Sequence, residues 1–118
     1  SALEGIRYYW SIVGKMAADP SRANGCMITN ASLEATQDPE ILDLLKSVHL
    51  RYDKQFKKML DRAVAQGELS EKADTLALAQ FLANGLQGIR VLARLNPDEK
   101  KVRNILDTTM SAIYQYKI

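Results

Sequence analysis

Cysteine is scarce in this chain of 118 residues, which contains only one. A single thiol excludes an intramolecular disulfide and a metal site built on several cysteines. Charge of one sign is also scarce: 16 basic residues against 14 acidic ones give a net charge of +2, too little to indicate nucleic-acid binding by charge alone. We therefore expect one globular domain in a reducing, cytoplasmic compartment.

Strand and membrane signals are weak as well. No sustained alternation of apolar and polar residues occurs, and Asn24-Gly25 leads into a helical pattern. The most apolar run, LALAQFLANGLQGIRVLARL, is interrupted by Gln80, Asn84, Gln87 and Arg90, so it does not predict a membrane span. The first residues enter a helical pattern directly, and we expect no signal peptide.

The residues needed for catalysis are lacking too. Cys26 and His49 would have to meet beside an oxyanion hole to form a nucleophile pair. His49 and Asp53, at i and i+4, are a weak metal signal, and no phosphate-binding loop is present. We predict no catalytic residue, no metal site and no cofactor, and hence a protein that is not an enzyme.

Residues that typically start or end helices, in contrast, are frequent. Asp19-Pro20 ends the first apolar stripe, Asp38-Pro39-Glu40 starts a long helix that Gly67 ends, and Asn96-Pro97-Asp98-Glu99 starts the last helix. The five predicted helices cover approximately residues 3–17, 24 or 25 to 36, 39–66, 74 or 75 to 95, and 99–113. This pattern predicts an all-α domain over residues 1–118, a five-helix antiparallel bundle.

The fourth predicted helix is apolar almost all round, more than one small bundle can cover. Its small residues, among them Gly85 and Gly88, would let another helix approach closely. A leftover apolar face predicts a partner, and a two-fold homodimer is the simplest arrangement. The residues expected near the partner are Gln87, Arg90, Val91, Arg94, Ile105, Thr109, Ala112 and Tyr116.

Three segments in order, GCMITNASLEATQDPEI, AQGEL and ALAQFLANGLQGIRVLARL, resemble the C-terminal ligand-binding and dimerisation domain of TetR/AcrR-family transcriptional regulators. The resemblance covers roughly residues 1–116. It implies an all-helical domain whose last two helices form a four-helix interface with a partner, and a cavity for a small, often apolar effector. The N-terminal helix-turn-helix domain that binds operator DNA in full-length members is absent from this chain. The function implied is effector sensing for a regulator, with a repressor as the expected class.

Such a cavity would be mostly apolar with a few polar groups that orient the ligand. Trp10 could equally be a core residue, Asn30 could cap a turn, and Asn84 could serve a buried hydrogen bond. The residues expected to line the cavity are Trp10, Met27, Asn30, Tyr52, Phe56, Phe81 and Asn84.

Cys26 is a candidate redox thiol because it opens the second predicted helix directly after Gly25. Amides and the dipole at a helix start lower a thiol pKa, whereas apolar burial beside Met27 and Ile28 raises it. A Gly-Cys opening also occurs in TetR-like sensors of oxidants or electrophiles. The alternative is an inert, small hydrophobic side chain.

A second function class fits the same residues. A free-standing helical dimer could carry an apolar molecule or bind a partner helix. The sequence upstream of Ser1 would distinguish the two hypotheses, because only a regulator requires a helix-turn-helix there.

Overall fold

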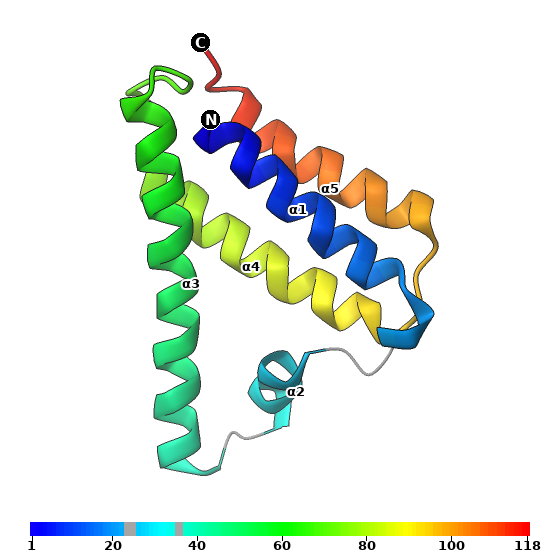
Figure 1. Cartoon of the computed structure of the whole chain (residues 1–118). Coiled ribbons are helices and arrows are strands. Elements are labelled where there is room, and N and C mark those ends of the chain that lie inside the picture. The colour runs from blue at the N-terminus through cyan, green and yellow to red at the C-terminus, as the bar shows by residue number, and fades with distance from the viewer. Residues whose placement is uncertain (23–25, 35–36) are drawn as a thin grey trace.

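The computed structural model describes residues 1–22, 26–34 and 37–118, and this part of the chain is all-helical (Figure 1). The predicted class and the five α-helices are confirmed. They are α1 (Ala2–Ala18), α2 (Met27–Glu34), α3 (Pro39–Ala65), α4 (Thr75–Ala93) and α5 (Glu99–Tyr114), with a 3-10 turn, η1 (Pro20–Arg22). The expected start of the second helix at residue 24 or 25 and its expected end at Thr36 lie outside the described residues.

Side-chain caps start the helices where the sequence places them. Asp38 accepts from the amide of Glu40 at 3.0 Å, and Asp98 accepts from Lys101 at 2.7 Å. Each cap satisfies an amide that the helix itself leaves unpaired. Gly67, with φ of 76°, adopts the left-handed conformation directly after α3 and lets the chain turn away.

α3 packs against α1 and α4, and α5 packs against the same two helices. In Figure 1, α3 runs along one side, α1, α4 and α5 lie obliquely beside it, and α2 sits at the far end near α3 and α4. The main core lies where α1, α3, α4 and α5 meet, and its members include Ile6, Trp10, Leu60, Leu86 and Ile113, all with less than 2% exposure. Burial of each aliphatic side chain contributes roughly 1.5–3 kcal/mol.

Gly14 of α1 packs against Leu106 and Val102 of α5. A Cβ atom at this position would overlap Cδ1 of Leu106, so a larger residue here would require the Leu106 side chain to shift. Next to this contact, a second cluster joins Ala17, Ile89, Ala93 and Val102. It holds the ends of α1 and α4 against the start of α5.

The α3–α4 loop closes the other end of the domain. The amide of Ser70 donates to the carbonyl of Tyr116 at 2.8 Å, and the amide of Ile118 donates to the carbonyl of Glu68 at 3.1 Å. The Glu68 carboxylate accepts from the amide of Leu3 at 3.3 Å. These bonds fasten the start of α1 and the segment after α5 to one loop.

α4 is the one helix of the described part that is long and apolar enough to cross a membrane by length and composition. The core helix of a soluble protein passes the same test, and α4 packs against both α1 and α3. Its buried side is formed by Leu78, Ala79, Leu82, Ala83, Leu86, Ile89 and Ala93. We therefore interpret α4 as the central helix of the core.

Candidate functional site

Two polar side chains of α4, Gln87 and Arg90, point toward α2 and α3. The hydroxyl of Thr29, a residue of α2 that is 3% exposed, donates to Oε1 of Gln87 at 2.6 Å. The Nε2 atom of Gln87 is buried and meets no hydrogen-bond partner among the described residues. The Thr29 bond therefore fixes the amide with its two N–H donors unused.

Arg90 contacts α3 in two ways. Its Nη1 donates to the hydroxyl of Tyr52 at 3.1 Å, and its Cζ lies 5.4 Å from the centre of the Tyr52 ring. Across the described ranges no carboxylate pairs with Arg90; the ion pair seen there joins Lys57 and Asp61. The half-buried guanidinium thus has a π face and a hydroxyl as its protein partners.

An aromatic group lies on the core side of this pair. Tyr9 meets both Trp10 and Phe56 edge to face, with ring centres 6.0 and 5.6 Å apart, while Trp10 stacks on Phe56 at 6.1 Å. The indole N–H of Trp10 is also buried without a partner in the described part of the chain. Indole and phenol groups usually find an acceptor when buried, so an unused donor within this apolar group is unusual.

Electrostatics link Tyr9, Cys26 and Arg90. Burial raises the pKa of the Tyr9 hydroxyl, and the charge of Arg90 opposes this shift. Burial also raises the pKa of the Cys26 thiol, but the Thr29 amide, the Arg90 charge and the Ile28 amide act in the opposite direction. The net effect lowers the Cys26 pKa below its ordinary value. The thiol is half-buried and lies just before α2.

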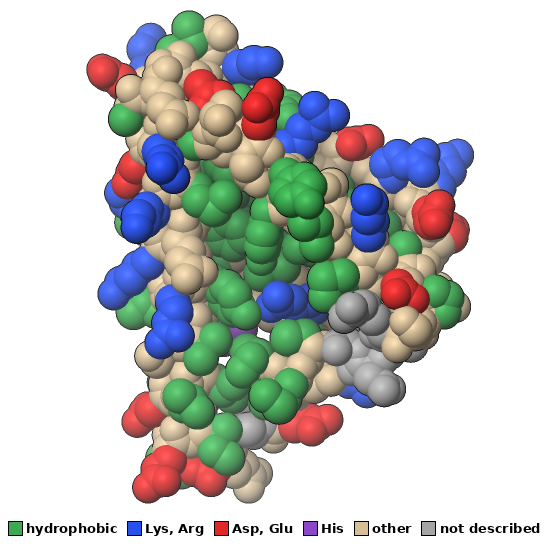
Figure 2. Space-filling view, viewed as in Figure 1, with side chains coloured by type: hydrophobic (Ala, Val, Ile, Leu, Met, Phe, Trp, Pro, Cys, Tyr) green, Lys and Arg blue, Asp and Glu red, His purple; other side chains and the backbone are tan. Residues whose placement is uncertain are grey.

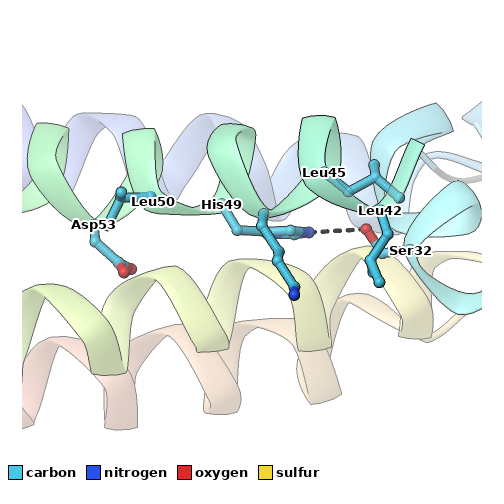
Figure 3. Close-up of a pocket in the computed structure, with 7 residues that line it drawn as sticks. Ser32, Leu42, Leu45, His49, Leu50 and Asp53 are labelled. Atoms are coloured by element: carbon cyan, nitrogen blue, oxygen red, sulfur yellow. Dashed lines mark hydrogen bonds between the residues drawn. The ribbon is translucent and has the colours of Figure 1, made fainter. Parts of the chain in front are cut away.

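A separate groove of about 520 Å³ lies between α2 and α3 (Figure 3). His49 Nε2 reaches across it to the hydroxyl of Ser32 at 2.8 Å. The His49 ring lies 6.1 Å from the ring of Tyr52, the residue that contacts Arg90. The remaining lining residues are Leu42, Leu45, Lys46, Leu50 and Asp53. In the described ranges no three metal-ligating side chains come together, at His49 and Asp53 or elsewhere.

The residues expected to line the cavity lie in different parts of the structure. Trp10 and Phe56 are core residues with 1% and 4% exposure, and Tyr52 is half-buried beside Arg90. Asn30 accepts a bond from Arg94 Nη1 at 3.4 Å, at the edge of the same region. Met27, in contrast, is 79% exposed.

The other two expected cavity residues, Phe81 and Asn84, lie away from the helices that surround Gln87 and Arg90. Phe81 is 45% exposed, and Asn84 is exposed one turn along α4. Helix periodicity places both on the side of α4 opposite Leu82 and Leu86. Their position is that of an outer surface and not of an internal wall.

The residues expected at a dimer interface also fall into two groups, those with contacts inside the chain and those that are partly exposed. Gln87, Arg90 and Arg94 make their contacts with α2 and α3 inside the chain, and Thr109 is 8% exposed with its hydroxyl bonded to the Ile105 carbonyl at 2.7 Å. Four are partly exposed and remain candidates for an intermolecular contact: Val91, Ile105, Ala112 and Tyr116.

From the sequence, Gln87 and Arg90 are expected at a dimer interface, and their contacts with Thr29 and Tyr52 are not predicted. The available signal was their i, i+3 spacing within an otherwise apolar helix, which places two polar groups on one side. Thr29 and Tyr9 carried no comparable signal, because their roles depend on contacts between helices.

Comparison with known proteins gives the context of this architecture. The family model "Tetracyclin repressor-like, C-terminal domain" matches residues 2–109. The chain is 29% identical over 115 residues to the HTH-type transcriptional regulator YezE of Bacillus subtilis, covering 96% of this chain and 59% of that protein. It is 27% identical over 103 residues to the HTH-type transcriptional repressor ComR of Escherichia coli, covering 86% and 49% respectively.

A solved structure shares the fold. The crystal structure of a TetR transcriptional regulator from Chloroflexus aurantiacus superposes with a TM-score of 0.83 at 19% identity, over 99% of this chain and 60% of that one. The chain thus spans about half to three fifths of the length of these relatives. With a family model matching almost its whole length, the chain belongs to the tetracyclin repressor-like C-terminal domain family.

Proposed function

We propose that this chain is the effector-binding and dimerisation part of a cytoplasmic transcriptional repressor. Its relatives are transcriptional regulators, one of them a repressor by name, and the chain is not an enzyme. The DNA-binding helix-turn-helix would belong to the part of those relatives that this chain does not span. A small effector would bind between α1, α2, α3 and α4 and favour one of two arrangements of the dimer, which changes operator affinity.

The observation that carries the effector site is the buried amide of Gln87. An N–H donor buried without a partner costs about 1–3 kcal/mol. A ligand with an acceptor atom would satisfy this donor. An apolar site with a few fixed polar groups is the usual composition of a small-molecule site.

The dimer part of the proposal rests on the outer face of α4. Residues 75–89 contain no charged side chain, although the face carrying Ala77, Phe81, Asn84 and Gly88 is uncovered within the chain. A Cβ added at Gly88 would meet nothing within 4 Å, so this position leaves room for another helix. With Val91 and the half-buried residues of α5, this outer face of α4 would pack against its symmetry mate as four helices.

The proposal is tested with the protein translated from the whole reading frame that contains this chain. That protein should select a palindromic sequence from a pool of random DNA duplexes, with half-sites about one helical turn apart or a multiple of it. Fluorescence anisotropy with the selected duplex should then show weaker binding when a small molecule that raises the melting temperature of this domain is added. A protein that binds such molecules but selects no DNA would instead be a carrier.

A further inference from the structure

We infer that the effector carries an acidic head group, a carboxylate in the simplest case, held by Arg90 and Gln87, and a hydrocarbon part that lies along Tyr9, Ile12 and Met16. This rests on the function proposed above and specifies the class of molecule that the site takes. The combination that points to it is an uncompensated cation beside an unused amide donor in apolar surroundings.

The donors come from two side chains whose other contacts are already fixed. The Thr29 hydroxyl donates to Oε1 of Gln87 at 2.6 Å, and Nε2 of Gln87 has no hydrogen-bond partner in the described part of the chain. The Tyr52 hydroxyl accepts a hydrogen bond from one nitrogen of Arg90 at 3.1 Å, and the guanidinium lies over the Tyr52 ring. Gln87 and Arg90 are neighbours on one side of α4 because they stand three residues apart. They therefore offer N–H groups to a bound molecule, while the Gln87 oxygen already accepts from Thr29.

The charges around Arg90 favour an anion. Tyr9 of α1 and Cys26 just before α2 are influenced by the Arg90 charge, and Tyr52 of α3 contacts Arg90 directly; none of these three is a carboxylate. Arg94, one turn further along α4, adds a second positive charge and bonds to an amide oxygen of Asn30. A planar guanidinium matches a carboxylate with two parallel hydrogen bonds, and such charge-assisted bonds are stronger than neutral ones.

The hydrocarbon part of the effector would lie on an apolar surface of α1. Tyr9 contacts Phe56 of α3, and Ile12 and Met16 continue along the same edge of α1 with 39% and 44% exposure. From Tyr9 to Met16 the helix rises about 10 Å, enough for a medium-length hydrocarbon chain. Figure 2 shows hydrophobic side chains gathered on the surface between α3 and α1, with Lys or Arg atoms enclosed by them.

The experiment compares three probes with the same chain length: decanoate, decanol and decyltrimethylammonium. Trp10 is the only tryptophan and belongs to the aromatic group beside the site, so its fluorescence reports binding directly. Decanoate should bind at least about 10-fold more tightly than decanol, which corresponds to about 1.4 kcal/mol. The cationic probe should bind more weakly than either.

Four variants assign this preference to named side chains. Arg90→Gln should weaken decanoate binding about 10-fold or more and change decanol binding less than about 3-fold, whereas Arg90→Lys keeps the charge and should retain part of the preference. Gln87→Glu should abolish decanoate binding, because its carboxylate pairs with Arg90 and repels the ligand. Arg51→Gln, which removes the same charge from an exposed position of α3, is the matched control and should bind like the wild type.

Each outcome decides the inference. Equal binding of decanoate and decanol to the wild type overturns the acidic head group but leaves an apolar effector site in place. Equal weakening of both probes by Arg90→Gln overturns the role of Arg90 in the same way. If none of the three probes changes the fluorescence or the melting temperature, both this inference and the apolar site of the proposed function fail.

Discussion

The guanidinium of Arg90 in α4 donates to the hydroxyl of Tyr52 in α3 at 3.1 Å and lies 5.4 Å from the centre of its ring. Together with the hydrogen bond from Thr75 Oγ1 to Asp61 Oδ1 at 2.6 Å, this contact is another polar link between α4 and α3. It also brings a positive charge close enough to influence the hydroxyl of Tyr9 and the thiol of Cys26. A change at Arg90 should therefore be detectable at each of these groups.

The thiol gives the first prediction. The pKa of Cys26 is lowered overall, so native labelling with a thiol reagent should reach its half-maximal rate below the free-thiol value of about 8.5. Arg90→Gln removes a positive charge that stabilises the thiolate, and its labelling midpoint should move to higher pH. The measurement is the labelling rate across a pH series.

Arg51→Gln is the control for this measurement, because it changes the net charge equally at an exposed position of α3. A wild-type midpoint at or above the free-thiol value would contradict the lowered pKa. Labelling that occurs only after denaturation would show a buried structural thiol and end the hypothesis that Cys26 senses oxidants.

The second prediction concerns the bond between Thr29 and Gln87. Thr29→Val keeps the shape but leaves both ends of the buried Gln87 amide without a partner, which should lower the free energy of unfolding by about 1–3 kcal/mol. Gln87→Leu in the same chain removes the unpaired group and should recover much of the loss. Urea denaturation of the two single variants and the double variant measures this coupling. Additive losses would show that the bond contributes nothing.

The third prediction compares two glycines of α1. Gly14→Ala should destabilise the domain by about 1–3 kcal/mol, because the new Cβ overlaps Cδ1 of Leu106 and the side chain must shift. Gly5→Ala meets nothing within 4 Å and should stabilise the helix by about 0.5–1 kcal/mol. Thermal unfolding of both variants should therefore move the melting temperature in opposite directions. Equal shifts would mean that α1 and α5 do not approach at Gly14 as described.

Local signals made much of the fold predictable. Asp38 and Asp98 cap the helices that the sequence assigns to them, and Gly67 ends the third helix with a positive φ. These features depend on a few neighbouring residues, so a single sequence carries them. The packing of α1 and α5 at Gly14 depends on two distant segments and was not predicted.

The orientation of α4 could not be read from the sequence for a related reason. A helix that is apolar all round has no polar side to mark the solvent, so its period does not show which face is internal. Sequence reasoning therefore placed Phe81 in the cavity and Arg90 at the dimer interface. The structure places Arg90 beside Tyr52, inside, and Phe81 on the outer face.

This division of α4 into an inner face for the effector and an outer face for a partner is the central claim, and sedimentation velocity of three proteins tests it most directly. The wild type should sediment as a dimer at micromolar concentration. Phe81→Glu, which places an unpaired charge in the proposed interface but at a position that is 45% exposed within the chain, should give a folded monomer. Arg90→Gln should remain a dimer. A monomeric wild type, or a dimer that Arg90→Gln dissociates and Phe81→Glu leaves intact, would contradict the account.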